Sequence, residues 1–212
     1  MAAVSTPESQ ENLHQSSESF VSRGGLKLAH ALDTFALTPH GMTCADLGCS
    51  TGGFTDCLLQ RGAAKVYSVD TAYGQLAWKL RSDDRVVVME RSNALHTEPV
   101  EQVDLVVIDL GWTVQKLAIP AAARWLKPDG CIVTLIKPHY EHTAHTHDRN
   151  ADIVLTPEVA ERIAHDTVQQ LESMGYMCDG LTPSPVIGGA RQGKKRKGTG
   201  NIEYLALVRC SS

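Results

Sequence analysis

Short runs of apolar, β-branched residues alternate with helix-like segments along most of this chain, and this alternation constrains its fold more than any other feature. The strand-like runs lie at 43–47, 65–70, 85–89, 103–109 and 131–137. They are almost entirely apolar, which is typical of parallel strands covered by helices on both faces. The sequence therefore predicts an α/β fold built around a mostly parallel sheet.

The carboxyl-terminal third departs from this pattern. Two strand-like runs, 177–181 and 201–208, follow each other without a helix between them, which predicts an antiparallel pair at one edge of the sheet. The helix before them has clear end signals, because Thr156 and Pro157 suit a helix start and Gly175 suits its end. Together with the five earlier runs, these strands predict a seven-stranded sheet.

The amino-terminal segment has a different composition from the rest. Residues 1–20 are rich in Ser, Glu and Gln, so we expect a disordered tail there. Apolar residues then recur at helical spacing until Pro39. We therefore predict a single folded domain over residues 21–212.

Composition narrows the class of protein. The formal net charge is −4, so any basic surface for a nucleic acid must be local. The six cysteines form no C-x-x-C pair and are expected to be reduced thiols in a cytoplasmic protein. No run approaches the ~18 apolar residues of a membrane span, and the first twenty residues lack an apolar signal core. We therefore expect no membrane partner.

A glycine-rich turn after the first strand is the first candidate site. Residues 46–54 read DLGCSTGGF, leaving a buried strand and opening a helix, and Asp70 ends the next strand. A carboxylate there can accept both hydrogen bonds of a ribose diol. The G-x-G-x-x-G motif of dinucleotide-binding proteins and the G-K-S/T motif of triphosphate-binding proteins are both missing, which favours S-adenosylmethionine over NAD or ATP. The alternative is an ordinary glycine turn that binds no cofactor. The predicted cofactor contacts here are Asp46, Gly48, Ser50, Gly53 and Asp70.

Several motifs in one order give a more specific resemblance. They are SRGGLKL at 22–28, the turn at 46–54, YGQL at 73–76, LIKP at 135–138, TPSP at 182–185 and GNIE at 200–203. This series closely resembles the FtsJ-like, hemolysin A-type (TlyA family) ribosomal RNA 2′-O-methyltransferases. The resemblance implies a Rossmann-like class I methyltransferase domain that uses S-adenosylmethionine. Members usually carry a small S4-type RNA-binding domain first, and we expect only the polar tail in its place.

The resemblance also implies a catalytic set. The Lys-Asp-Lys-Glu tetrad of the family falls on Lys27, Asp109, Lys137 and Glu203. Lys137 is expected to have a depressed pKa and to act as base or activator of the ribose 2′-hydroxyl. Lys27 and Glu203 would set its charge state and orient the ribose, and Asp109 would contact the cofactor and the lysines. No metal is expected, because the methyl donor already carries a positive charge.

Other contacts are predicted with alternatives left open. The resemblance implies that Gly52 and Phe54 of the glycine-rich turn contact the cofactor and that Asn93 lies near the adenine. Asn93 would also suit a turn. Arg23 and Trp112 are predicted to contact RNA; Trp112 lies in LGW where the family usually reads VSF, and it would either stack on a flipped base or pack at a helix start. Residues 139–147 contain four histidines. We favour a polar, mobile substrate loop there over a metal site.

A basic run completes the predicted interface. Residues 191–197 carry five positive charges, on Arg191, Lys194, Lys195, Arg196 and Lys197. Such a cluster indicates phosphate binding, with a solvated loop or a localisation tract as the alternative. The sequence therefore predicts a ribose methyltransferase whose partner is RNA, most simply ribosomal RNA or a ribosomal subunit. A non-catalytic RNA- or cofactor-binding relative is the rival hypothesis.

Overall fold

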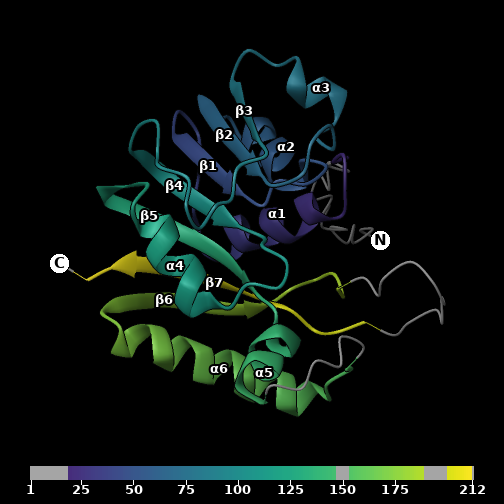
Figure 1. Ribbon diagram of the computed structural model, residues 1–212, viewed down its shortest axis with the longest axis vertical. Coiled ribbons are helices and arrows are strands. Elements are labelled where there is room, and N and C mark those ends of the chain that lie inside the picture. Colours follow the sequence, from purple (N-terminus) through teal and green to yellow (C-terminus); the bar gives the residue numbers. More distant parts are fainter. Residues whose placement is uncertain (1–18, 147–152, 189–199, 212) are drawn as a thin grey trace, which may run out of the picture.

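A single seven-stranded sheet organises the computed structural model, which describes residues 19–146, 153–188 and 200–211. The strand order is β3-β2-β1-β4-β5-β7-β6 (Figure 1). The strands are β1 (Thr43–Leu47), β2 (Lys65–Asp70), β3 (Val86–Glu90), β4 (Val103–Ile108), β5 (Leu126–Ile136), β6 (Tyr176–Pro183) and β7 (Tyr204–Cys210). The helices are α1 (Gly24–Thr34), α2 (Gly53–Gln60), α3 (Trp78–Arg81), α4 (Gln115–Ala123), α5 (Pro138–Thr146) and α6 (Pro157–Ser173).

Strands β1 to β5 are parallel and β7 runs antiparallel to both β5 and β6, which confirms the predicted mixed sheet with its antiparallel edge pair. From β1 the chain first adds strands on one side, β2 and β3, and then on the other, β4 and β5. The strand order therefore reverses between β1 and β4. In open α/β sheets, ligands bind beyond the carboxyl ends of the strands at such a reversal.

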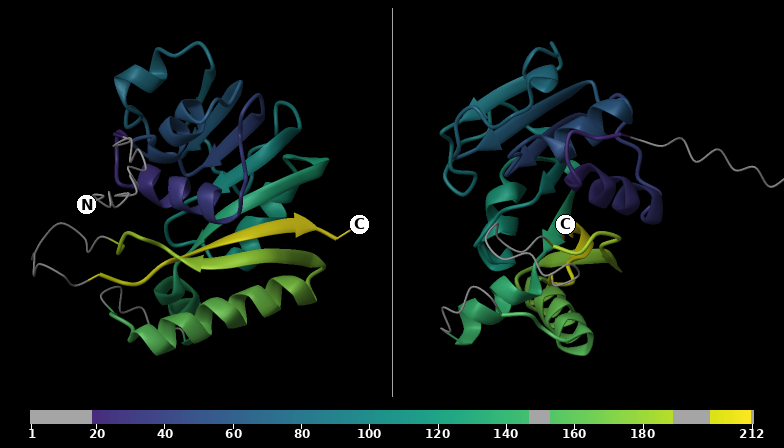
Figure 2. Two further views of the ribbon diagram at one scale, coloured as in Figure 1. Left: turned by 180° about the vertical axis from the view of Figure 1, so that it is seen from behind. Right: turned by 90° about the vertical axis from the view of Figure 1, so that its right-hand side faces the viewer.

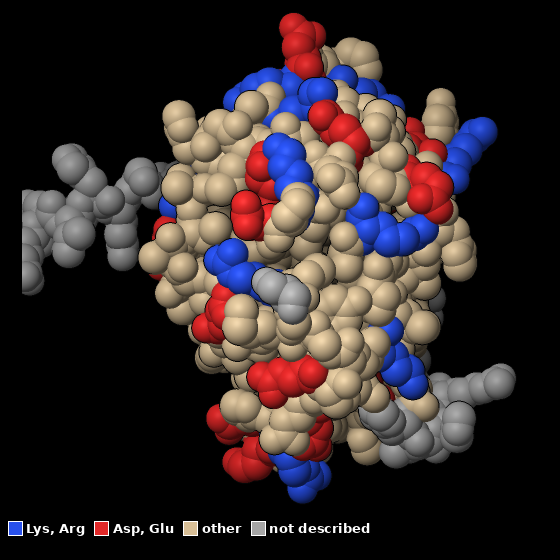
Figure 3. Space-filling model, turned by 90° about the vertical axis from the view of Figure 1, so that its left-hand side faces the viewer, with Lys and Arg blue, Asp and Glu red and all other residues tan. Residues whose placement is uncertain are grey.

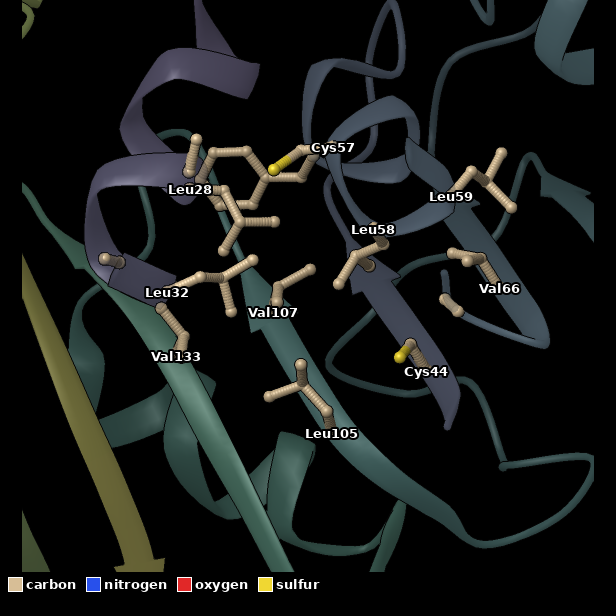
Figure 4. Packing of buried hydrophobic residues seen from close by; sticks show 14 of the residues in the cluster. Leu28, Leu32, Cys44, Cys57, Leu58, Leu59, Val66, Leu105, Val107 and Val133 are labelled. Atoms are coloured by element: carbon tan, nitrogen blue, oxygen red, sulfur yellow. The ribbon is translucent and has the colours of Figure 1, made fainter. Parts of the chain in front are cut away.

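Helices cover both faces of the sheet, as the apolar strands predict. Helices α1 and α2 lie on one face, and α4 and α6 lie on the other (Figures 1 and 2). Alternate residues of β4 belong to the hydrophobic cores on the two faces of the sheet. Leu105 and Val107 face α1 and α2, whereas Val106 and Ile108 face α4. Figure 4 shows the first core, where Leu28 and Leu32 of α1 approach Val107 and Val133.

Helix α6 follows its end signals closely. The Thr156 hydroxyl accepts a hydrogen bond from the Val159 amide, and Pro157 opens the first turn. Its buried residues, Ala160, Ala164, Thr167 and Leu171, lie on one face and pack toward the sheet. After the helix, Gly175 adopts a φ of 88°, the left-handed conformation that favours glycine.

The structure corrects several sequence-based boundaries. Strand β5 begins at Leu126, five residues before the predicted start, because a bulge opposite Val103 and Leu105 absorbs the Pro- and Gly-containing segment. Strand β7 begins at Tyr204, so Glu203 precedes the strand. The histidine-rich segment is predicted to be a loop, but residues 138–146 form helix α5.

The amino-terminal boundary also shifts slightly. Residues 1–18 of the predicted tail lie outside the described residues. Phe20, which the sequence places in the tail, packs against the core under α1 and lies directly against Gly25, where a Cβ would come within 2.2 Å of the ring. The backbone amide of Val21 donates to the Asp56 carboxylate at 2.8 Å. The packed part of the chain therefore includes Phe20.

All six cysteines are free in the structure. Four of them are buried: Cys44, Cys49, Cys57 and Cys131. Among the described residues, none of the helices has the length and apolar character required to cross a bilayer.

Candidate active site

A cleft of about 920 Å³ opens beyond the carboxyl ends of β1, β2, β4 and β5. Its walls come from the residues that follow these strands and from the start of α1. This volume lies in the range of small-molecule sites. The cleft therefore lies at the reversal of strand order between β1 and β4.

The glycine-rich turn after β1 forms the floor of the cleft. Gly48, with a φ of 92°, lies so close to the Asp109 backbone that a Cβ would come within 2.7 Å of its carbonyl oxygen. Gly48, Ser50, Gly53 and Phe54, which are predicted to contact the cofactor, line the cleft. The first turn of α2 begins here, and at Gly48 and Gly53 the backbone can approach a ligand without an intervening side chain.

Two residues predicted to contact the cofactor lie behind the cleft wall. Asp46 is fully buried, and its carboxylate accepts bonds from the Thr55 amide and hydroxyl, at 2.9 and 2.7 Å. Burial raises its pKa to about 7. Gly52 faces α3, where a Cβ would come within 2.3 Å of Leu80 and 2.7 Å of Leu76. Both residues therefore support the turn.

Asp70 lies at the end of β2 and lines the cleft. One carboxylate oxygen accepts from the Ser50 amide at 2.7 Å, and the other accepts from the Ala72 amide at 2.8 Å. A carboxylate has about four acceptor positions, so these bonds leave two for a diol. Asn93 also lines the cleft, and its side-chain oxygen accepts from the Leu95 amide at 3.0 Å, so it forms the turn that the alternative interpretation proposed.

The four tetrad residues form two ion pairs. Lys137, directly after β5, contacts Asp109, directly after β4, with 2.5 Å between Nζ and Oδ1. Lys27 of α1 contacts Glu203 with 2.5 Å between Nζ and Oε2. Lys27, Asp109 and Lys137 line the cleft, whereas Glu203 is buried behind Lys27. The structure thus brings together residues from four distant parts of the sequence.

The charge state of Lys137 differs from the sequence-based expectation of a depressed pKa. Burial of the ammonium group lowers the pKa, but the adjacent Asp109 carboxylate, and more weakly Glu203, raise it by a larger amount. The net result is a pKa above the ordinary value for lysine. Lys137 is therefore a cation in this state of the protein, and it also donates to the Leu110 carbonyl at 3.1 Å.

Two of the predicted RNA contacts, Arg23 and Trp112, lie among the described residues. Arg23 is exposed at the start of α1 and lines the cleft. Trp112 also lines the cleft, is 58% exposed, and stacks on Tyr140 with ring centroids 4.7 Å apart. It lies in a left-handed loop conformation before α4, so it is not a packing residue of that helix. The basic run 191–197 lies outside the described residues.

Sequence reasoning missed the residues behind this cleft. Tyr140 belongs to the segment interpreted as a loop, and Glu141 on the same helix is almost completely buried. Glu141 accepts a hydrogen bond from the Gln115 amide at 2.8 Å. A charged residue in a histidine-rich segment gives no local signal of burial, because only contact with α4 removes it from water.

Residues 20–190 match the model of the FtsJ-like methyltransferases. The chain belongs to the FtsJ-like methyltransferase family. The family resemblance derived from the sequence motifs is therefore confirmed, and the Rossmann-like topology of the sheet agrees with it.

Individual relatives of this FtsJ-like protein cover most of the chain. It is 39% identical over 190 residues to YqxC of Bacillus subtilis, an alignment covering 88% of this chain and 64% of YqxC. It is 38% identical over 210 residues to TlyA of Mycobacterium tuberculosis, named a 16S/23S rRNA (cytidine-2′-O)-methyltransferase, covering 98% of this chain and 75% of TlyA. A solved structure of a candidate hemolysin from Streptococcus thermophilus superposes with a TM-score of 0.78 at 37% identity, covering 92% of this chain and 68% of that one.

Proposed function

We propose that this protein methylates ribose 2′-hydroxyl groups of RNA, most simply ribosomal RNA, with S-adenosylmethionine as the methyl donor. The observation that carries the proposal is the Lys137–Asp109 ion pair, which lies in the cleft at the reversal of the sheet. The relative TlyA of Mycobacterium tuberculosis, whose name states this reaction, supports the same substrate class.

The cleft has the donors and acceptors that this cofactor requires. Asp70 retains acceptor positions for a ribose diol, and the turn at Gly48 and Ser50 brings backbone close to the ligand. Asn93 supplies amide donors near Leu95, which is suited to the adenine edge. When bound, the cofactor supplies a methyl group on a positively charged sulfur.

The tetrad would prepare the hydroxyl that receives the methyl group. A 2′-hydroxyl is a weak nucleophile, and it must lose its proton as the new oxygen–carbon bond forms. We assign Lys137 to the 2′-oxygen: its ammonium group donates a hydrogen bond that orients the oxygen and offsets developing negative charge. The Asp109 carboxylate, which is paired with Lys137, would take up the departing proton directly or through the lysine.

The second ion pair would orient the substrate. Lys27 lines the cleft and is held by Glu203, which is itself only 4% exposed. We assign Lys27 to a ribose or phosphate oxygen of RNA, and Glu203 to fixing the position of Lys27. Arg23 at the same end of α1 and Trp112 across the cleft would contact neighbouring parts of the nucleotide.

Methyl incorporation from labelled S-adenosylmethionine tests the proposal. The purified protein is incubated with isolated ribosomal subunits and with naked ribosomal RNA from cells that lack it, and the label is located by mapping 2′-O-methyl positions. We expect incorporation at a defined ribose with wild-type protein and none with Asp109→Ala. Cofactor or RNA binding without incorporation into either substrate would instead support the non-catalytic relative.

A further inference from the structure

A buried carboxylate links the two segments that carry the Asp109–Lys137 pair. Glu141 of α5 is only 2% exposed, and one of its oxygens accepts from the Gln115 amide at 2.8 Å. Gln115 is the first residue of α4, and its N-cap, Val114, has no side-chain acceptor. Glu141 therefore satisfies an amide at the start of α4 from a neighbouring helix.

The side chain of Gln115 connects the same point to the sheet. Its amide nitrogen donates to the Leu135 carbonyl at 3.1 Å, and its oxygen accepts from the Thr134 hydroxyl at 2.7 Å. Both partners belong to β5, which ends next to Lys137. Gln115 is 3% exposed, so this network is shielded from water. We call Glu141, Gln115 and Thr134 the α4 clasp.

The clasp fixes one end of the loop at 110–114. The other end follows Asp109, whose amide donates to the Leu47 carbonyl at 3.1 Å, and Lys137 holds the Leu110 carbonyl. Between these ties, Trp112 adopts a φ of 59°, a conformation that an L-residue keeps only when its surroundings hold it. Helix α5 also supplies Tyr140, on which Trp112 stacks.

We propose that Glu141 is a positioning residue for methyl transfer: through the α4 clasp it holds the loop at 110–114, and with it Trp112 and Asp109, against Lys137. Glu141 does not line the cleft, so it acts through these residues without touching substrate. Apart from Asp109, whose own amide is held by the Leu47 carbonyl, the predicted cofactor contacts that line the cleft come from other elements: the turn after β1, the end of β2 and the turn at Asn93. Loss of the clasp should therefore reduce turnover and leave cofactor affinity intact.

Two variants distinguish the effect of the hydrogen bond between Glu141 and the Gln115 amide from the effect of the Glu141 charge. Glu141→Ala removes the acceptor of the Gln115 amide, whereas Glu141→Gln keeps an oxygen at the same place. We expect Glu141→Ala to lower the single-turnover rate about 10- to 100-fold, the scale of a small misplacement of reacting groups. Glu141→Gln should restore most of the rate. Cofactor affinity, measured by calorimetry, should stay within about twofold of wild type in both variants.

A second readout does not require activity. Hydrogen exchange of the amides at 110–115 should be at least about fivefold faster in Glu141→Ala, because the loop loses its tie. Thr134→Val removes only the hydroxyl that is bound to Gln115 and should accelerate exchange by a smaller factor. This variant replaces Glu141→Ala in the test if Glu141→Ala does not fold. Glu172→Ala, the loss of a carboxylate at the far end of α6, is the matched control and should change neither measurement.

The outcomes distinguish this inference from the function on which it rests. If wild-type protein transfers no methyl group to RNA, the proposed function fails, while the hydrogen-exchange comparison still tests the clasp. If wild type is active and folded Glu141→Ala is equally active with unchanged exchange at 110–115, the positioning role is wrong. A parallel loss of cofactor affinity and rate would also contradict it, because the clasp would then support the whole cleft.

Discussion

Lys137 is subject to two opposing electrostatic effects. Burial disfavours its ammonium form, and the adjacent Asp109 carboxylate favours it more strongly, so its pKa lies above the ordinary range for lysine. The sequence could indicate that Lys137 belongs to the site, because it directly follows a buried strand. The sequence could not indicate the direction of the pKa shift, which depends on an ion pair formed only in the folded chain.

The pH dependence of methyl transfer tests the charged form of Lys137. If the cation is active, the single-turnover rate should fall only at pH values above the ordinary range for lysine, where the ammonium loses its proton. Lys137→Ala should lower the rate by roughly 10²-fold or more and leave cofactor affinity nearly unchanged. A rate that increases with the deprotonation of Lys137, and is abolished in Lys137→Arg, would assign it the role of a neutral base.

Asp70 has two structural bonds and a predicted ligand contact. Asp70→Ala should weaken S-adenosylmethionine binding by about 1.5 to 3 kcal/mol for each bond to the ribose that it removes. It should also release the Ser50 and Ala72 amides, which the carboxylate now holds. Asp70→Asn keeps the size and acceptor oxygen but loses the charge, so calorimetry on both variants separates the two effects. Unchanged affinity in folded Asp70→Ala would show that the ribose lies elsewhere.

At the scale of elements, the strands of the parallel half could be predicted because each is an apolar run covered on both faces. Helix α5 could not. Its residues are mostly polar, and among those whose burial is described the buried ones are Pro138 and Glu141. Glu141 enters the interior by accepting a hydrogen bond from the first amide of α4. The start of β5 was missed for a similar reason, because the bulge after Leu126 depends on pairing with β4. Tertiary hydrogen bonds decide both cases.

Gly52, in the turn between β1 and α2, is required both for its backbone conformation and for the space around it, and a comparison with Gly41 separates the two contributions. Gly52 has a φ of 97°, and a Cβ would approach Leu80 to 2.3 Å, whereas Gly41 has a φ of 74° with open space around it. Gly52→Ala should cost about 2 to 4 kcal/mol of unfolding free energy, from backbone strain and overpacking together. Gly41→Ala should cost about 1 kcal/mol, from strain alone. Equal losses in denaturant unfolding would remove the packing contribution.

The α4 clasp also predicts a pH dependence of stability. Burial raises the pKa of Glu141 from its ordinary 4.5 to about 7. Between these values the folded protein binds more protons than the unfolded chain, so this group lowers stability as pH rises through that window, by up to about 3 kcal/mol. Glu141→Gln removes this loss while keeping the bond to Gln115.

Unfolding of wild type and Glu141→Gln should therefore be compared at pH 4 and pH 8. The variant should gain stability relative to wild type at pH 8, and the difference should shrink at pH 4. Asp46, whose pKa is also raised by burial, is present in both proteins and cancels in the comparison. A difference that does not depend on pH would show that Glu141 has the same pKa in the folded and unfolded chains.

At the scale of the molecule, strand order was the feature that local patterns could not provide. Motifs on β1, β4 and β5 predicted that their ends carry a site, but only the order β2-β1-β4-β5 puts Asp70, Asp109 and Lys137 around one cleft. The pairing of Lys27 with Glu203 likewise requires α1 to lie near β7. The family resemblance predicted these four residues as one set, because the members of a family share a fold and therefore the same spatial arrangement of their motifs.

Charge distribution gives the last prediction, which concerns RNA. Figure 3 shows the side of the molecule where β7 ends, and there blue and red side chains are interspersed without a large area of one sign. The basic run at 191–197 joins the described chain at Gly188 and Gly200. Gly188 lies against Glu203, where a Cβ would come within 2.5 Å of the carboxylate, so a described residue that flanks the run lies beside the tetrad.

Neutralising the run should therefore weaken RNA binding and flatten its salt dependence. Replacing the five cations at 191–197 by Gln should reduce the slope of log affinity against log salt by about 0.7 to 0.9 for each phosphate that the protein no longer neutralises. Lys127→Gln with Arg209→Gln, at the ends of β5 and β7 opposite to the cleft, is the control and should leave the slope unchanged. Cofactor affinity should stay constant in both proteins, because the predicted cofactor contacts lie in other segments of the chain, and Lys127 and Arg209 do not line the cleft. An unchanged slope in the neutralised run would identify it as a solvated loop and leave recruitment of RNA to Arg23, Lys27 and Trp112.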